Sequence, residues 1–383
     1  MRVQMQHALN ARARGLRERD EARFRRTLRR ADRGLVEDQL TYFDNITQLP
    51  VGVLRYKVDP ATITPVQGSD DYWVEVVMAL GLDGYDAAPV RTRDRFRFTP
   101  VSGGRRMVVA STDDEGWERD HPGNAQPWDL QPITVDQSVG VLGIFDASTA
   151  AHSQDVIDAA TEGRYDVRST LGVTDERPVA SGVVIYSVQD AAFLRGLAGQ
   201  TVGDPDRADG LTIAVPVDGA TPRRGVASYR VYLNPRVLDD DRVVLGRLVR
   251  HELTHATLRQ RGRRAPLWLN EGIAEYVSVQ AMPLERRRLP ADALEVGARA
   301  RDLPGEREFA SADAEAWYAV SWWVCEYIAR TYGPATLFGL LDRIDAGGDP
   351  AEVVSAALGI TTSQLTQRGV ALMTTTYGQH GTG

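Results

Sequence analysis

The chain is poor in the residues that build disulfide-stapled folds and cysteine metal sites. It has one cysteine, Cys325, among 383 residues. A single cysteine excludes an intrachain disulfide and a cysteine-rich zinc site. No histidine lies near Cys325 in the sequence, so we expect a buried apolar residue rather than a nucleophile. Any zinc would have to be held by carboxylates and by some of the six histidines.

Long apolar runs and an excess of positive charge are also missing. No stretch approaches the roughly 18 apolar residues of a membrane span, so we expect no integral membrane segment. Residues 1–20 lack the apolar middle of a signal peptide, and we expect the chain as written to be soluble. The formal net charge is -7. Nucleic-acid binders are usually basic, so no nucleic-acid partner is expected.

The composition that remains is typical of a globular protein with a sizeable core, with 43% hydrophobic and 25% charged residues. Residues 1–49 show apolar residues at helical spacing, and Pro50 ends this pattern. Four strand-like runs follow, at 51–58, 71–82, 95–100 and 105–111. Helices followed by antiparallel strands predict an α+β unit, which would close at a linker-like, Pro/Gly-rich segment over 121–132.

Arginine is concentrated at the beginning of the chain. Residues 1–40 contain eleven arginines and six acidic residues. Such a surplus is typical of a solvated helix face with i,i+4 ion pairs, which is the interpretation we favour. The alternative is a patch that binds an acidic surface or lipid headgroups.

The first half also resembles a known fold. The run "RDEARFRRTL", a Leu-Pro entry to the sheet and a terminal "PWD" are similar to the nuclear-transport-factor-two-like cone fold. It is similar to the version found ahead of some bacterial extracytoplasmic peptidase domains, over about residues 10–130. The resemblance implies a cone-like accessory domain over residues 1–132, with a possible protein partner. The residues of this half show no catalytic cluster.

The second half, residues 133–383, predicts a small mixed sheet and a largely helical C-terminal part. Strand-like runs occur at 139–145, 181–187, 211–217 and 227–235, and a long helix is expected over about 241–260. The run 227–235 could be an edge strand that binds substrate backbone, or it could be internal to the sheet.

The helix over 241–260 contains the sequence "HELTH". His251 and His255 are four residues apart, so they project from one helix face and can reach one zinc ion at about 2.0–2.1 Å. Glu252 would lie beside the metal, where a general base can take a proton from metal-bound water. The alternative is a buried helix with two hydrogen-bonded histidines, which is costly without partners.

Zinc with two histidines usually takes a third protein ligand. The metzincin pattern fails, because Leu258 and Arg261 occupy the positions where it requires glycine and histidine. A second helix over about 268–280 offers Glu271 and Glu275. They are four residues apart, so both can face the metal helix.

"HELTH" together with "WLNEGIAEY" resembles the gluzincin group of zinc metallopeptidases, the peptidase MA clan, and most closely its bacterial peptidase MA-like domains. The resemblance implies one Zn²⁺ per chain with Glu271 as the third ligand. It implies that Glu275 accepts a hydrogen bond from a zinc-bound histidine. Fifteen residues separate His255 from Glu271, fewer than in larger gluzincins, which predicts a tighter turn. Glu275 would match the longer spacing by count and is the alternative third ligand. Tyr318 resembles the tyrosine that aminopeptidase-like members place downstream to stabilise the oxyanion; a core aromatic is the alternative.

These patterns predict zinc-dependent hydrolysis of peptide bonds in a peptide or protein substrate, by an endopeptidase or small-peptide hydrolase. The intact base Glu252 favours this function. The alternatives are a non-catalytic, zinc-stabilised binding or assembly module of the cell envelope and a zinc-free helical scaffold. The resemblance implies an extracytoplasmic location, secreted or membrane-anchored, with a cytoplasmic location as the alternative.

Overall fold

The computed structural model describes the chain except for residues 122–124, 173–181, 196–207, 219–224, 259–260 and 379–383. Its fold is mixed α+β, as the sequence predicts at this coarse level. Contacts divide the chain into two compact units. Unit 1 comprises Met1–Thr161 and Glu176–Asp240, and unit 2 comprises Glu162–Asp175 and Asp241–Gly383. The expected division into domains at residues 132 and 133 stays a prediction.

Unit 1 begins with three helices rather than one continuous helical stretch. They are α1 (Arg2–Arg17), α2 (Glu21–Arg25) and α3 (Arg33–Gln48). The breaks occur at two aspartates that cap the following helix: Asp20 accepts a hydrogen bond from the Arg23 amide, and Asp32 accepts one from the Leu35 amide. N-cap residues adopt non-helical backbone angles, so each aspartate ends one segment and starts another.

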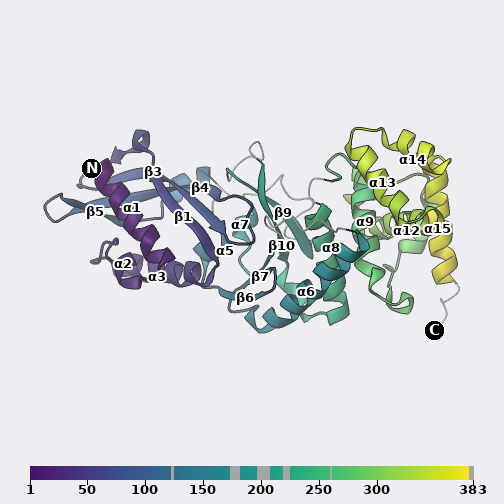
Figure 1. Cartoon of the computed structure of the whole chain (residues 1–383), viewed down its shortest axis with the longest axis horizontal. Coiled ribbons are helices and arrows are strands. Elements are labelled where there is room, and N and C mark those ends of the chain that lie inside the picture. Colours follow the sequence, from purple (N-terminus) through teal and green to yellow (C-terminus); the bar gives the residue numbers. More distant parts are fainter. Residues whose placement is uncertain (122–124, 173–181, 196–207, 219–224, 259–260, 379–383) are drawn as a thin grey trace. The chain divides into compact units, whose positions relative to one another are not determined.

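The first sheet of unit 1 is antiparallel and curled into a half-barrel. Its strands are β1 (Val51–Val58), β3 (Tyr72–Leu82), β4 (Val90–Val101) and β5 (Arg106–Ser111), in that spatial order, with the short β2 (Thr64–Pro65) paired to β3. The α1 helix runs across this sheet (Figure 1) and contacts β1 and β5. Alternate residues of β1, such as Leu54 and Tyr56, are buried, which matches the period of a strand with one covered face.

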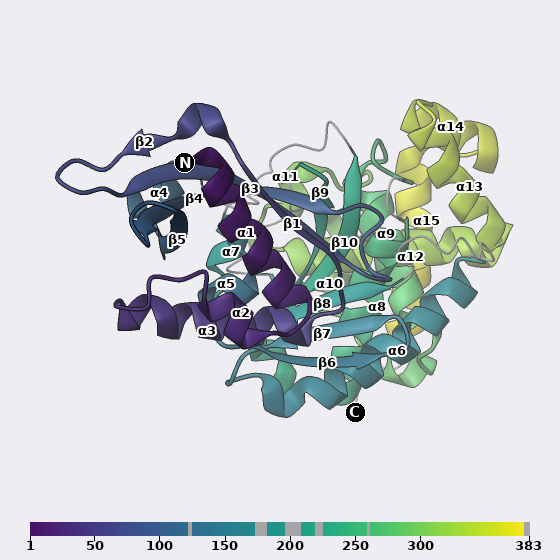
Figure 2. The same ribbon diagram turned by 60° about the vertical axis from the view of Figure 1, so that its left-hand side comes forward.

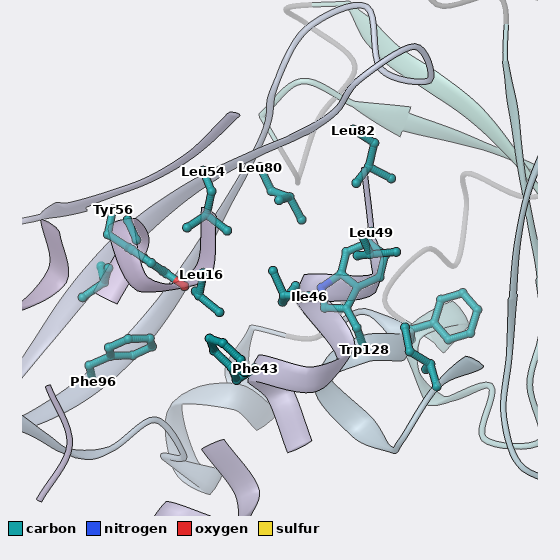
Figure 3. Packing of buried hydrophobic residues seen from close by; sticks show 14 of the residues in the cluster. Leu16, Phe43, Ile46, Leu49, Leu54, Tyr56, Leu80, Leu82, Phe96 and Trp128 are labelled. Atoms are coloured by element: carbon teal, nitrogen blue, oxygen red, sulfur yellow. The ribbon is translucent and has the colours of Figure 1, made fainter. Parts of the chain in front are cut away.

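Helices and sheet share one apolar core. Figure 3 shows Leu54 and Leu80 from the strands packed near Leu16, Phe43 and Ile46 from the helices. All five side chains are at most 6% exposed. Burial of a leucine or phenylalanine side chain contributes about 1.5–3 kcal/mol, so this core is the main force that holds α1 and α3 on the sheet.

The segment predicted as a linker is part of this core. Its described residues include α5 (Pro127–Leu130), and Trp128 is only 2% exposed. The Asn45 amide donates to the carbonyls of Trp128 and Gln131 at 2.9 and 2.8 Å and accepts from the Ile133 amide at 3.0 Å. The linker interpretation was therefore wrong for residues 125–132, because a buried tryptophan and a buried asparagine tie them to α3. Residues 122–124 lie outside the described part.

A second, mixed sheet also belongs to unit 1. Its strands run in the order β6 (Thr134–Ser138), β7 (Val141–Phe145), β8 (Val183–Ser187), β10 (Val226–Leu233) and β9 (Gly210–Pro216). The three central strands are parallel, and β6 and β9 pair antiparallel at the ends. Because β10 is paired on both sides, the internal alternative holds, and this strand is not an edge that could accept a substrate strand.

Unit 2 is helical in its described residues (Figure 2). It contains α8 (Arg242–Leu258), α9 (Leu267–Gln280), α10 (Ala293–Arg299), α11 (Glu306–Phe309), α12 (Ala314–Tyr332), α13 (Pro334–Asp345), α14 (Pro350–Leu358) and α15 (Thr362–Gly378). The central helix is α12, which contacts α9, α10, α13 and α15. Its Trp322 and Trp323 are fully buried, and so is Cys325, as the sequence predicts.

The remaining described helices are short apart from α6. They are α4 (Glu115–Asp120), α6 (Ser153–Thr170) and α7 (Ala192–Arg195), with 3-10 turns at Pro60–Thr62, Ala150–His152, Pro235–Asp239 and Leu284–Arg286. Among the described residues, no helix has both the length and the apolar character that a membrane span requires.

Candidate metal centre

In the run Trp268–Gly272, the residues around Glu271 have separate structural roles. Trp268 and Leu269 are buried in the core of unit 2, at 3% and 0% exposure. The Asn270 amide donates to the carbonyl oxygens of Gly262 and Ala265 at 2.9 and 3.2 Å. Gly262 has φ of 91°, which favours glycine. Asn270 therefore fixes the short turn that leads into α9, just before Glu271.

Gly272 allows α9 to approach α12 closely. A Cβ atom at this position would lie 2.6 Å from the carbonyl oxygen of Ser321 and 2.7 Å from Sγ of Cys325. No larger residue fits without a shift of one helix. The glycine thus fixes the position of α9, and with it the carboxylate of the neighbouring Glu271.

Glu271 meets the two histidines of α8. Nε2 of His251 and Nε2 of His255 are 3.1 Å apart. Oε2 of Glu271 lies 3.4 Å from the first and 3.3 Å from the second. Glu271 is 5% exposed, and the three residues form a group able to hold a metal ion. We call His251, His255 and Glu271 the ligand cluster.

The ligand cluster has the dimensions of a tetrahedral zinc site. Bonds of about 2.0–2.1 Å in a tetrahedron separate neighbouring ligand atoms by about 3.3–3.4 Å. The three measured separations, 3.1, 3.3 and 3.4 Å, lie close to this range. Two imidazoles and one carboxylate are also a common donor set for zinc, with a fourth position left for water or substrate. The residues present therefore fit a zinc ion.

Glu275 reaches the other side of His251. Its Oε1 lies 3.2 Å from Nδ1 of His251, and its Oε2 accepts a hydrogen bond from Nη2 of Arg247 at 2.6 Å. Burial would raise the pKa of Glu275, but the Arg247 charge and the His251 hydrogen bond lower it to about 2. An ionised Glu275 accepts the Nδ1–H of His251 and leaves Nε2 directed at the ligand cluster.

The electrostatics of the cluster favour a positive charge at its centre. Burial lowers the pKa of His251, but hydrogen bonds to Glu271 and Glu275 outweigh it and raise that pKa well above its usual value. Burial raises the pKa of Glu271, but the two histidines outweigh it and hold that pKa well below its usual range. A metal cation held between these groups would add the positive charge that the buried carboxylates favour.

Glu252 and Tyr318 both lie near the ligand cluster. Glu252 follows His251 on α8 and is 5% exposed. The ring centroid of Tyr318 is 6.4 Å from that of His251. Burial raises the pKa of Tyr318, and the charges of Glu271, Glu275 and Glu252 raise it further, so the phenol keeps its proton at neutral pH.

Tyr318 also packs on an aromatic neighbour. Its ring centroid lies 5.1 Å from that of Phe309 in an edge-on arrangement. The two interpretations of Tyr318, as oxyanion donor and as core aromatic, therefore both remain predictions.

Arg247 was not among the site residues predicted from the sequence. This residue supports Glu275 through the bond described above, and its guanidinium lies 5.5 Å from the ring centroid of Trp322. A signal was present, because Arg247 precedes His251 by four residues and so shares its helix face. A positive charge on the helix face that carries the two histidines could have indicated a partner for one of the two glutamates of α9.

Comparison with known proteins adds no family: a scan against protein-family models and a search of curated proteins both return no match.

Proposed function

We propose that the protein is a zinc-dependent hydrolase of peptide bonds. The observation that carries this proposal is the spacing of the three donor atoms, 3.1–3.4 Å, which is close to the edges of a zinc tetrahedron. The buried Glu252 follows the first ligand directly in the sequence. When bound, a zinc ion supplies a Lewis acid that polarises a carbonyl group and acidifies water. The substrate is a peptide or a protein segment.

The protein's own residues carry the proton steps. Glu252 accepts a proton from the water that attacks the carbonyl carbon. It then gives that proton to the amine nitrogen as the carbon–nitrogen bond breaks. Tyr318 donates its phenol O–H to the oxygen on which negative charge develops. The position of its ring, with its centroid 6.4 Å from that of His251, supports this role.

Glu275 and Arg247 act by positioning. Arg247 keeps Glu275 ionised, and Glu275 orients the His251 ring through Nδ1. Neither residue needs to contact substrate. An imidazole held in this orientation does not have to be reoriented when the metal binds.

The test is cleavage of a quenched peptide library by the zinc-loaded full chain, with products identified by mass spectrometry. We expect cleavage by the wild type and a decrease of about 10²–10⁴-fold in Glu252→Gln, the usual contribution of general acid–base catalysis. Zinc content should be the same in both proteins.

Glu352→Gln is the matched control, because Glu352 is an exposed glutamate on α14 and the change is chemically identical. It should cleave at the wild-type rate. Zinc-loaded wild type that cleaves no peptide would refute the proposal and support a binding module. Equal rates for Glu252→Gln and the wild type would refute the role of Glu252.

A further inference from the structure

Unit 1 has a hollow with a volume of about 310 Å³ on its surface. The walls come from the N-terminal half of α1, from α2 with the residues after it, and from the start of β5, which all lie at the same end of the unit (Figure 1). Most of its polar lining residues have side chains with nitrogen atoms that can donate hydrogen bonds. They are Gln4, His7, Arg23, Arg26, Arg105 and Arg106. We call this feature the basic pocket.

None of the described residues that line the basic pocket has an acidic side chain. Arg23 forms ion pairs with Glu18 and Asp20, neither of which lines the pocket. The other three arginines bond only to backbone or to nothing in the described part of the chain. Arg105 donates from Nε to the carbonyl of Ser102 at 3.2 Å, and Arg106 donates from Nη2 to the carbonyl of Arg26 at 3.4 Å.

The arginines stand around a floor that is already ordered. Ala8, Thr27 and Met107 are at most 9% exposed. The Thr27 carbonyl accepts the Val109 amide at 2.8 Å, which fixes the residues after α2 against β5. An ordered floor needs no rearrangement when a ligand binds, which limits the entropy that binding costs. The pocket is therefore more than a set of solvated side chains along one helix.

A second hollow in unit 1 differs from the basic pocket in the charge of its lining. It has a volume of about 250 Å³ and includes Arg17 and Arg19, but Asp83 lies in its wall. There the protein supplies its own negative charge. The basic pocket is lined by four arginines from two segments, Arg23 with Arg26 and Arg105 with Arg106. The last three have no acidic partner in the described part of the chain, and an anion would relieve their mutual repulsion.

We propose that the basic pocket binds a small ligand with clustered phosphate-type negative charge. Arginine binds phosphate groups through paired N–H donors, and several arginines around one hollow suit a group with two or more charged oxygens. The volume lies at the lower end of the range for small-molecule sites, roughly 300–1,000 Å³. Such a group could belong to a soluble phosphorylated molecule or to the headgroup of an anionic phospholipid.

The test uses the full chain with two probes. One is inorganic tripolyphosphate, titrated calorimetrically. The other is sedimentation with vesicles, either of phosphatidylcholine alone or of phosphatidylcholine and phosphatidylglycerol in equal parts. The pocket variant is Arg26→Gln/Arg105→Gln, and the control is Arg33→Gln/Arg55→Gln. All four arginines are exposed, and each double variant changes the net charge from -7 to -9, because two positive charges are removed.

We expect the wild type and the control to bind, and the pocket variant to bind at least about tenfold more weakly, since charge-assisted hydrogen bonds are lost. Tripolyphosphate binding without vesicle binding would identify a soluble ligand. Binding to the mixed vesicles that the pocket variant loses would identify a headgroup. Failure of the wild type to bind either probe would overturn the proposal. So would equal binding by the pocket variant and the control. A conservative Arg26→Lys/Arg105→Lys variant should bind with intermediate affinity, because it keeps the charge but loses the paired donors.

Discussion

At the scale of single residues, the two glutamates of α9 differ in which nitrogen they reach. Glu271 lies against Nε2 of both histidines, whereas Glu275 lies against Nδ1 of His251 alone. Sequence spacing places both glutamates on one face of α9 but cannot separate them, because residues four apart share that face. Which glutamate meets which nitrogen depends on where α9 packs against α8. That position depends on Gly272 and on the turn held by Asn270.

Replacing Glu275 tests its positioning role. Glu275→Ala should lower zinc affinity by about 10–100-fold, the usual effect of losing a residue that orients a metal ligand. Glu275→Gln should recover part of the loss, because its amide oxygen can still accept the His251 N–H. The measurement is competition with a chromophoric chelator. Wild-type affinity in Glu275→Ala would contradict the role.

We expect Asp94 to make the stability of unit 1 depend on pH. Burial raises its pKa to about 7; nearby Glu118 adds to this, while the Arg95 amide and Arg12 oppose it. Unfolded aspartate titrates near 3.9, so the folded protein holds the proton more strongly. The stabilisation is full below about pH 4 and is lost as the pH rises through about 7, by up to about 1.4 kcal/mol per pH unit.

The Asp94→Asn variant should show a weaker dependence, because the amide has no proton to release near neutral pH; Asp129, whose pKa burial also raises to about 7, keeps its own share. Its Oδ1 can still accept the Arg95 amide, as Asp94 does at 2.6 Å. Urea denaturation near pH 5 and near pH 8 measures the effect. The wild type should lose more stability between the two values than the variant. Equal losses would show that Asp94 titrates normally.

At the scale of elements, periodicity predicts the helices and strands with strong patterns but misses those without one. The expected strand over 71–82 is β3, and the expected helix over 241–260 corresponds to α8 in its described residues. In contrast β6, with the sequence TVDQS, has too few apolar residues to show alternation. It forms a strand by pairing antiparallel with β7.

The α5 helix illustrates a second limit. A segment rich in proline and glycine is typical of a linker. The burial of Trp128 and its bond from Asn45, more than eighty residues earlier, decide otherwise. Such long-range contacts cannot be deduced from local composition.

The α9–α12 contact gives a prediction at this scale. Gly272→Ala should destabilise the protein by about 1–3 kcal/mol, because the new methyl group would collide with α12. Gly339→Ala on α13 is the control, since its Cβ would have nothing within 4 Å. Alanine there should be neutral or stabilise by up to about 1 kcal/mol. Thermal or chemical denaturation of both variants measures the difference, and similar stabilities would contradict the packing argument.

At the scale of the whole molecule, the proposed activities belong to different units. The ligand cluster, Glu252, Glu275 and Tyr318 are all in unit 2, and the basic pocket is in unit 1. Unit 2 therefore contains every residue assigned to peptide hydrolysis. Variants of the basic pocket should leave the metal content unchanged, which keeps the tests of the two proposals independent.

The most direct test of the account is the metal content of the purified full chain, measured by plasma mass spectrometry after reconstitution with zinc. The account predicts about one zinc per chain in the wild type, as expected for one two-histidine, one-carboxylate site. It predicts loss of that zinc in Glu271→Ala and retention in Glu352→Ala. A wild type that binds no zinc, or a Glu271→Ala variant that binds as much as the wild type, would contradict the central claim.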